Sequence, residues 1–199
     1  LASSAASDVY KRQLYIGIPF CPTTCLYCSF TSYPLVSWRQ KVDSYLDALE
    51  KELDYVAVKF GKKHLNSIYI GGGTPTTLEP YQLDRLIRKI RCSFDLSHCL
   101  EFTVEAGRPD SITREKLETL KKWDITRISI NPQTMKDETL KIIGRRHTVA
   151  QTVESFQLAR ELGFDDINMD LIMGLPEESL EDVRDTLEQV KALKPDNLT

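Results

Sequence analysis

The sequence predicts an α/β fold: a partial (β/α) barrel of the TIM type with about five βα units, truncated before its sixth strand. Short apolar runs alternate with amphipathic helical patterns from residue 14 onward, which is typical of a parallel sheet. The unusual residues lie where the apolar runs end, as the active face of a barrel requires. A doubly wound sheet is the alternative, but no G-x-G-x-x-G follows the first strand and no G-x4-G-K-S/T occurs.

Length and composition fit a single domain. A chain of 199 residues is long enough to bury about 70% of its unfolded surface. The formal net charge of −3 gives no basic footprint, so nucleic acid is not an expected partner. No apolar run approaches the ~18 residues of a membrane span, so we expect no membrane-spanning segment.

The first residues differ in character from the rest of the chain. Residues 1–13 are small and polar, and we interpret them as a non-native, adapter-like tail; a disordered native tail is the alternative. The domain is therefore assigned to residues 14–199. The start lacks the apolar segment of a signal peptide, and five cysteines, an odd number, fit a reducing compartment. We expect a cytoplasmic protein.

The expected strands are apolar runs bounded by turn residues. The first ends at Pro19, and Asn131 and Pro132 break the fourth. The expected strands cover residues 14–18, 67–70, 101–106, 127–130 and 167–173. Residues 196–199 begin a sixth strand, and the open edge left there is expected to favour aggregation.

The expected helices follow the 3.6-residue period of apolar side chains. The longest keeps this period over residues 38–60 and stops at Gly61. Further helices are expected at residues 80–91, 111–123, 136–143, 149–162 and 179–193. Because helices separate the successive strands, the strands are expected to run parallel.

Three cysteines stand directly after the first strand. Cys21, Cys25 and Cys28 have the spacing C-x3-C-x2-C. A zinc site normally closes with four Cys or His ligands, whereas three thiolates on one loop suit a [4Fe–4S] cluster. The fourth iron would then be open to a substrate or cofactor. We predict an iron–sulfur cluster, with zinc and a chance grouping as the alternatives.

The other potential ligands are not expected to complete this site. His64, His98 and His147 are scattered along the sequence. Cys92 and Cys99 lie between the second helix and the third strand, and we expect them to pack as small apolar residues.

Unusual residues also follow the second and third strands. The stretch GGGTPT, residues 71–76, is either a simple turn or a loop whose glycines let backbone approach a ligand closely. Glu105 ends an apolar strand, where a carboxylate needs a partner. A structural ion pair with Arg127 or Arg108 is the alternative to a binding role.

The cysteine spacing after a first barrel strand resembles the radical S-adenosylmethionine (SAM) superfamily, and the similarity extends over residues 14–199. The resemblance implies a [4Fe–4S] cluster on the three cysteines, with SAM at the open iron cleaved to a 5′-deoxyadenosyl radical. It also implies contacts to SAM. The glycine loop, with Gly72, Gly73 and Thr74, would receive the methionine amine, and Glu105 would contact the positively charged amino-acid part. Gln133 and Asp170 would bind the ribose hydroxyls, and Arg145, rather than Arg146, would pair with the carboxylate. Tyr15, Tyr27 and Phe30 are expected to shield the cluster.

Further motifs narrow the resemblance. LYIGIPFC, YCSF, IGGGTPT, EFTVEAGRP, RISINPQTM and NMDLIMGLP are similar to the oxygen-independent coproporphyrinogen III oxidases, in particular to the clostridial-type coproporphyrinogen dehydrogenase branch. This implies an oxidoreductase that decarboxylates coproporphyrinogen III to protoporphyrinogen IX in haem biosynthesis. The implied partners are a porphyrinogen or haem-type small molecule and an electron donor such as flavodoxin or ferredoxin. No catalytic residue is assigned beyond the cluster and SAM site.

Two positions depart from the oxidase pattern. Gly17 stands where the bacterial oxidases have histidine, and Phe30 stands where they have a fourth cysteine. Phenylalanine instead matches the related haem chaperones, so a haem chaperone or haem-trafficking protein is the alternative function. A zinc-binding structural module is a third reading. The resemblance implies that the residues separating oxidase from chaperone lie mainly in a C-terminal domain. Half of the expected substrate-facing wall is missing from these 199 residues, so we expect them alone to be inactive.

Overall fold

The computed structural model describes residues 12–61 and 63–199. Its main feature is one sheet of parallel strands in the order β1-β4-β5-β6-β7-β8. The strands are β1 (Gln13–Ile18), β4 (Ser67–Gly72), β5 (Glu101–Gly107), β6 (Arg127–Ile130), β7 (Ile167–Met169) and β8 (Asn197–Leu198). A separate pair, β2 (Phe20–Cys21) with β3 (Tyr33–Pro34), frames the cysteine loop.

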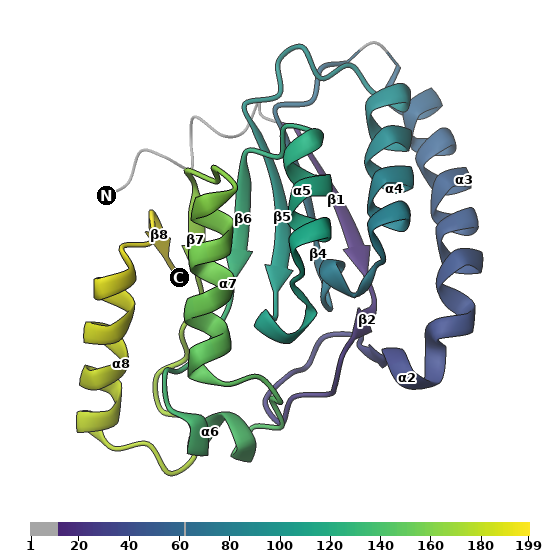
Figure 1. Ribbon diagram of the computed structural model, residues 1–199. Helices are drawn as coiled ribbons and strands as arrows, with labels where there is room; N and C mark the ends of the chain where they lie inside the picture. Colours follow the sequence, from purple (N-terminus) through teal and green to yellow (C-terminus); the bar gives the residue numbers. More distant parts are fainter. Residues whose placement is uncertain (1–11, 62) are drawn as a thin grey trace.

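Helices join the successive strands of the sheet and cover one of its faces (Figure 1). They are α2 (Leu35–Trp38), α3 (Val42–Phe60), α4 (Pro80–Ser93), α5 (Arg114–Lys122), α6 (Asp137–Ile142), α7 (Val149–Glu161) and α8 (Leu180–Leu193). Short 3-10 turns lie at Arg39–Lys41, Pro75–Thr77 and Pro109–Ser111. This architecture confirms the predicted α/β fold with a parallel sheet, open and consistent with a partial barrel.

Local sequence signals explain where several helices begin. Glu79 and Gln82 form a capping box at α4, Thr148 and Gln151 form one at α7, and Ser179 with Asp182 forms one at α8. Each box satisfies backbone N–H groups that the first helical turn leaves without a partner. These helix starts are therefore fixed by residues within the same short segment.

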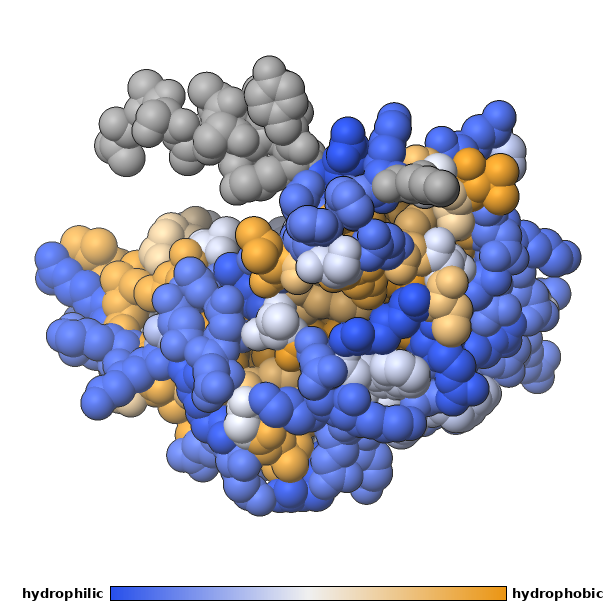
Figure 2. All heavy atoms as spheres, turned by 90° about the horizontal axis from the view of Figure 1, so that it is seen from above, coloured by the Kyte–Doolittle hydropathy of each residue, from blue (hydrophilic) through white to orange (hydrophobic). Residues whose placement is uncertain are grey.

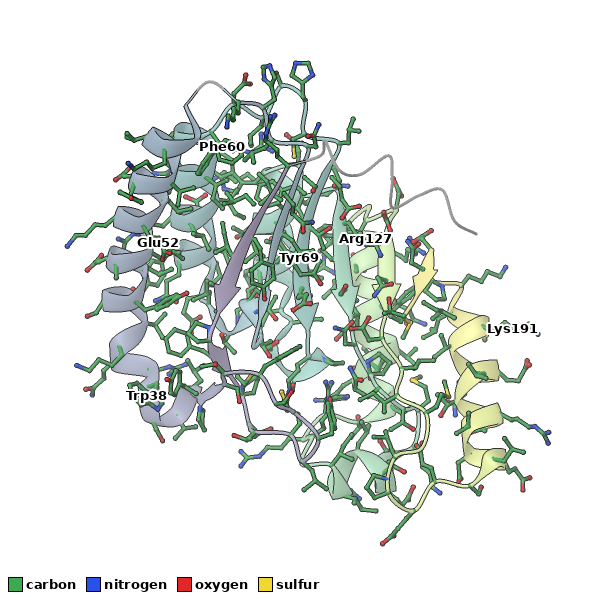
Figure 3. The ribbon with its side chains drawn as sticks, turned by 180° about the vertical axis from the view of Figure 1, so that it is seen from behind. Trp38, Glu52, Phe60, Tyr69, Arg127 and Lys191 are labelled. Atoms are coloured by element: carbon green, nitrogen blue, oxygen red, sulfur yellow. The ribbon has the colours of Figure 1, made fainter. Side chains whose placement is uncertain are left out.

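Alternation along the strands divides the sheet into two chemically different faces. Ile16 and Ile18 of β1, and Ile68 and Ile70 of β4, are buried in the main hydrophobic core with the helices. The intervening Tyr69 points to the other face, which in the described part of the chain carries no helix (Figure 3). That inner face is polar and open.

Some boundaries differ from the expectations. Strand β1 begins at Gln13, inside the expected tail, because Arg12 and Asn66 exchange backbone and side-chain hydrogen bonds that extend the pairing. Residues 1–11 of that tail lie outside the described residues. The long helix is preceded by α2 and the 3-10 turn rather than starting at residue 38. Strand β7 ends at Met169, because the chain continues only as an isolated bridge at Leu171.

The expectation for Cys92 was wrong, whereas that for Cys99 was partly correct. Cys92 is exposed, because it lies on the outer face of α4 rather than on the face toward the sheet. Cys99 is half-buried and packs against the main core. Neither is close to the cysteine loop in the fold, since both belong to the segment that leads into the amino end of β5.

The end of the sheet opposite the cysteine loop carries a largely hydrophilic surface, on which hydrophobic residues emerge in patches (Figure 2). Strands β1 and β8 form the two edges of the sheet, so the described sheet does not close on itself. None of the described helices combines the length and the apolar character needed to cross a bilayer.

The packing of α4 on the sheet makes a prediction about stability. Leu86 is 1% exposed in the main core, whereas Leu100 is 81% exposed. We expect Leu86→Ala to lower the free energy of unfolding by about 2–5 kcal/mol, because it leaves a cavity. Leu100→Ala should change it by less than about 0.5 kcal/mol. Urea unfolding of both variants measures this, and equal effects would contradict the assigned core.

Candidate cofactor site

The structure brings every residue of the predicted site to one cavity at the carboxyl ends of the strands. The cavity has a volume of about 130 Å³. The cavity is lined by all the site residues that the sequence predicts: Cys21, Cys25, Cys28, Gly72, Gly73, Thr74, Glu105, Gln133, Arg145 and Asp170. They lie at the carboxyl ends of β1, β4, β5, β6 and β7 or in the segments that follow these strands, so the parallel sheet is what assembles them. Their roles toward a cofactor stay predictions.

The three cysteines of the loop are free thiols on one side of this cavity. Cys21 is buried, and Thr74 Oγ1 donates a hydrogen bond to its Sγ at 3.6 Å. Burial raises the pKa of the Cys21 thiol, while the Thr74 hydrogen bond and the charge of Arg108 act in the opposite direction. The surroundings of Cys21 thus already contain groups that favour a thiolate.

The cysteine loop is fastened to the segment after α6. The Leu26 N–H donates to the Ile143 carbonyl at 3.0 Å, and Thr23 Oγ1 donates to the Gly144 carbonyl at 2.9 Å. Leu26 itself is 70% exposed, so its backbone rather than its side chain fixes the loop. Residues more than a hundred positions apart in sequence therefore hold the three thiols in place.

The glycine loop lies directly against the start of the cysteine loop. The Gly73 N–H donates to the Ile18 carbonyl at 2.7 Å, and the Thr74 N–H donates to the Phe20 carbonyl at 2.8 Å. Gly72 has φ +103°, which L side chains rarely adopt. A Cβ on Gly73 would lie 2.7 Å from the Phe20 carbonyl oxygen and 2.9 Å from Cys21 Sγ. Glycine is required here because two backbone segments meet.

Glu105 is held in the cavity by Tyr69, whose hydroxyl donates to Oε1. Burial raises the pKa of the Glu105 carboxyl, and the nearby Asp170 raises it further. The hydrogen bonds from Tyr69 and from the Gly72 backbone lower that pKa. An ammonium group beside Glu105 would stabilise the charged carboxylate further and so offset the remaining cost of its burial.

The alternative ion pairs for Glu105 are not present in the structure. Arg127 lies 3.9 Å from carboxylate oxygens of both Glu101 and Asp166. Arg108 pairs with Asp110 at 2.8 Å. Glu105 is therefore not the partner of either arginine, and its charge is free to interact with a ligand in the cavity.

Asp170 and Gln133 meet at the ends of β7 and β6. The Gln133 N–H donates to the Asp170 carbonyl at 3.0 Å, and the Gln133 backbone has φ +72°, a conformation uncommon for a residue other than glycine. Asn168 Nδ2 donates to Asp170 Oδ1 at 2.7 Å. Burial raises the pKa of the Asp170 carboxyl, and that hydrogen bond opposes the effect. The irregular end of β7 is what turns Asp170 into the cavity.

Arg145 is 7% exposed and spans the cavity wall. Its Nε and Nη2 donate to the Tyr27 hydroxyl at 3.2 and 2.9 Å, and its Nη1 donates to the Asn131 carbonyl. Burial is the main cause that raises the pKa of Tyr27 to about 12, so this hydroxyl stays protonated. Arg145 consequently keeps a buried positive charge without a carboxylate partner among these contacts.

The three residues expected to shield the cluster are placed differently. Tyr27 and Phe30 line the cavity, although Phe30 is also 69% exposed. Tyr15 is 58% exposed and stacks on Tyr69 on the inner face, with ring centroids 5.9 Å apart. Tyr15 does not belong to the cavity lining, because its strand position lies before the carboxyl end of β1.

Sequence reasoning missed three lining residues: Gly107, Arg108 and Asn131. Arg108 follows β5 within the unusual stretch EFTVEAGRP, so its position was a usable signal. From the sequence alone, Arg108 is interpreted only as a possible ion-pair partner of Glu105. Asn131 had been read as a strand breaker, and its backbone carbonyl instead holds Arg145.

The residues fit an iron–sulfur cluster better than a single metal ion. Within residues 12–61 and 63–199, no three His, Cys, Asp or Glu side chains are placed to share one ion. A zinc ion needs such convergence, because its ligands lie about 2.0–2.3 Å from one centre. A cubane cluster instead attaches each cysteine to a different iron. The thiols that line one cavity, with donors to Cys21 and Cys25, meet that requirement.

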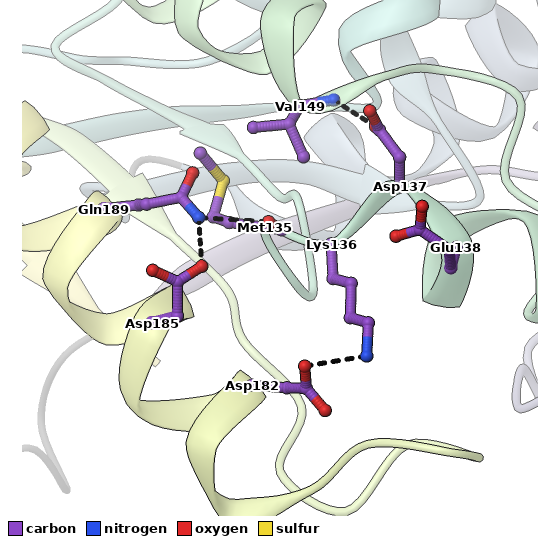
Figure 4. A pocket seen from close by; sticks show the side chains of 8 residues that line it. All are labelled: Met135, Lys136, Asp137, Glu138, Val149, Asp182, Asp185 and Gln189. Carbon is purple, nitrogen blue, oxygen red and sulfur yellow. Dashed lines mark hydrogen bonds and ion pairs between the residues drawn. The ribbon is translucent and has the colours of Figure 1, made fainter.

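A larger hollow lies between α6, α7 and α8 and is shown in Figure 4. Its volume is about 450 Å³, and it shares no lining residue with the cysteine cavity. Lys136 is paired with Asp182 at 2.7 Å, and Gln189 donates to Asp185 at 2.7 Å. These polar groups bind one another and connect α8 to the rest of the fold, so we assign the hollow a structural role.

The close approach at Gly73 predicts a difference between two glycines. Gly73→Ala should lower the free energy of unfolding by about 1–3 kcal/mol, because the new methyl group meets backbone and sulfur atoms. Gly17→Ala should be tolerated, since the nearest atom to its Cβ is Tyr15 Cε1 at 3.5 Å. Denaturant unfolding tests the pair, and a stable Gly73→Ala variant would contradict the described contact.

Buried His147 predicts a pH dependence of stability. His147 is only 2% exposed, and neither nitrogen of its ring has a hydrogen-bond partner among the described residues. Burial is the main cause that lowers its pKa from 6.5 to about 4. Between pH 4 and pH 6.5, His147 therefore binds a proton in the unfolded chain but not in the folded chain. The stabilisation is present above pH 6.5 and is lost as the pH falls toward 4, by up to about 3 kcal/mol.

Unfolding measured between pH 7 and pH 4.5 tests this, with His147→Leu as the comparison. The variant should lose less stability than the wild type over this range, because it carries no titrating ring. Parallel pH profiles for the two proteins would show that His147 is not the group responsible.

Residues 15–190 match the model of the radical SAM superfamily. The oxygen-independent coproporphyrinogen-III oxidase-like protein HemZ of Bacillus subtilis is 46% identical, over 98% of this chain and 40% of its own length. The heme chaperone HemW of the same organism is 42% identical, over 92% of this chain and 48% of its own.

The solved structure of coproporphyrinogen III oxidase (HemN) from Escherichia coli is similar in fold, with a TM-score of 0.85 and 32% identity. The similarity covers 94% of this chain and 44% of that structure, so the chain spans less than half the length of these relatives. The family match extends over both the sheet and the cysteine loop. The chain therefore belongs to the radical SAM superfamily, whose members use a [4Fe–4S] cluster and SAM.

Proposed function

We propose that this chain is the cofactor-binding core of a radical SAM oxidoreductase that decarboxylates coproporphyrinogen III to protoporphyrinogen IX in haem biosynthesis. One observation carries the proposal: residues at or beyond the carboxyl ends of four further strands line a single cavity with the three cysteines that follow β1. In this assignment Cys21, Cys25 and Cys28 hold the [4Fe–4S] cluster. When bound and reduced, the cluster supplies the electron that cleaves SAM to methionine and a 5′-deoxyadenosyl radical.

The proposed SAM contacts follow from charge and position. Glu105 faces the ammonium group, which offsets the burial of its carboxylate. Arg145 faces the SAM carboxylate, where two guanidinium N–H groups that now donate to Tyr27 are available for exchange. Gln133 and Asp170 face the ribose hydroxyls. Gly72, Gly73 and Thr74 bring backbone close to the methionine amine.

The protein's own contribution to such chemistry is positioning and the exclusion of water. The Tyr69 hydroxyl and the Gly72 backbone orient Glu105, and both partly oppose the rise in its pKa that burial causes. The backbone bonds between the glycine loop and the cysteine segment fix the distance between the two halves of the site. A reactive radical would thus form within a largely pre-arranged cavity.

The porphyrinogen substrate is supported by the oxidase-like relatives and by the shared sequence motifs. We propose that the substrate lies against the open inner face of the sheet, next to the carboxyl ends of the strands. A cytoplasmic location and an electron donor of the flavodoxin or ferredoxin class belong to the same proposal.

A haem chaperone on the same scaffold is the second candidate. It is favoured by Phe30, a cavity-lining residue that matches the chaperones, and by 42% identity to HemW. An assay with SAM, a reductant and coproporphyrinogen III separates the two functions. Formation of a vinyl product supports the oxidase, whereas tight haem binding with 5′-deoxyadenosine but no vinyl product supports the chaperone.

The cluster assignment predicts the behaviour of two cysteine variants. After anaerobic reconstitution, the wild type should show a broad absorption in the blue that is bleached on reduction. Cys25→Ser should lose this absorption and most of the bound iron, because one of three ligands is gone. Cys92→Ser should retain both, since Cys92 is exposed on α4. Stoichiometric zinc without iron in the wild type would refute the assignment.

A further inference from the structure

Arg108 is a buried cation in the cavity wall, and none of the proposed SAM contacts involves it. It directly follows β5, and its side chain is 3% exposed. A buried guanidinium carries a large desolvation cost, so its position needs compensating contacts. The described contacts of Arg108 divide into two groups, one made by Nε and Nη2 and the other made by Nη1.

The first group fixes the orientation of the side chain. Arg108 Nε donates to Asp110 Oδ1 at 3.0 Å, and Nη2 donates to Asp110 Oδ2 at 2.8 Å. This two-point pairing defines the plane of the guanidinium as well as its distance. Asp110 lies in the 3-10 turn Pro109–Ser111, so the anchor and the arginine belong to the same short segment.

The second group connects Arg108 to the cysteine loop. Its Nη1 donates to Thr23 Oγ1 at 2.7 Å, to the Thr23 carbonyl at 3.2 Å and to Cys25 Sγ at 3.7 Å. Thr23 in turn donates to the Gly144 carbonyl. The loop is thus held between Arg108 on one side and the segment after α6 on the other.

A fixed positive charge and an N–H donor beside a cysteine sulfur have a defined effect on a metal cluster. Hydrogen bonds to the sulfur ligands and the local net charge are among the factors that set the reduction potential. Reduction adds one negative charge, which a nearby cation stabilises, and burial limits the screening of that interaction.

We propose that Arg108 is a positioning residue that orients the Cys25 thiolate and raises the reduction potential of the cluster bound to this loop. The inference rests on the proposed cluster site and adds to it a residue that controls the cluster's electron affinity. A purely structural ion pair with Asp110 would instead leave the potential unchanged when the arginine is replaced.

A redox titration of the anaerobically reconstituted protein tests the inference, with the reduced cluster followed by electron paramagnetic resonance. Arg108→Met should have a more negative midpoint potential, with at least a tenfold shift in the ratio of oxidised to reduced cluster. For a one-electron couple this is about 59 mV. Arg108→Lys keeps the charge but not the paired geometry and should lie between the two. Arg146→Met removes an exposed arginine near the same loop and should match the wild type.

The outcomes separate this inference from the proposed function. A wild type that binds no iron–sulfur cluster overturns both. A wild type with a cluster, and an Arg108→Met variant with equal iron content and the same potential, overturns the role of Arg108 alone. If Arg108→Met does not retain iron, Arg108→Lys decides: a potential more negative than that of the wild type supports the inference, and an unchanged potential overturns it.

Discussion

The parallel pairing of β1 with β4 is the constraint on which the site depends. Their register places Ile18 opposite Gly72, so the cysteine loop and the glycine loop leave the sheet side by side. Backbone hydrogen bonds from Gly73 and Thr74 then fasten one loop to the other. The contact is close enough to exclude a methyl group at Gly73. The proposed metal ligands and the proposed SAM contacts are consequently coupled through backbone atoms rather than through exchangeable side chains.

Electrostatics organise the remaining part of the cavity. Glu105 and Asp170 are half-buried carboxyls with raised pKa values, and Arg108 and Arg145 are buried cations that line the same cavity. Hydrogen bonds from Tyr69 and Asn168 partly compensate the two acids. Charges of both signs at separate points suit a ligand that itself carries an ammonium and a carboxylate, as the amino-acid end of SAM does.

Much of this arrangement was accessible from the sequence, because most of the predicted site residues lie at the end of an apolar run or shortly after it, and parallel strands bring such positions to one edge. Exposure around the helices was harder to predict: Cys92 looks apolar but lies on the outer face of α4. The end of β7 at Met169 depends on a bridge between Gln133 and Leu171, which no local pattern encodes. Arg108 was missed as a site residue because its contacts to Thr23 and Cys25 span more than eighty positions.

In the described part of the chain the helices cover one side of the sheet, while Tyr15 and Tyr69 stack on the other, inner face. Neither tyrosine belongs to the main hydrophobic core or to the lining of the cysteine cavity. Under the proposed function, such a scaffold can diverge at these positions in what it accepts while the cofactor site stays the same. The relatives include an oxidase-like protein and a chaperone. Such diversity can evolve where the cofactor site and the inner face of the sheet are formed by separate residues.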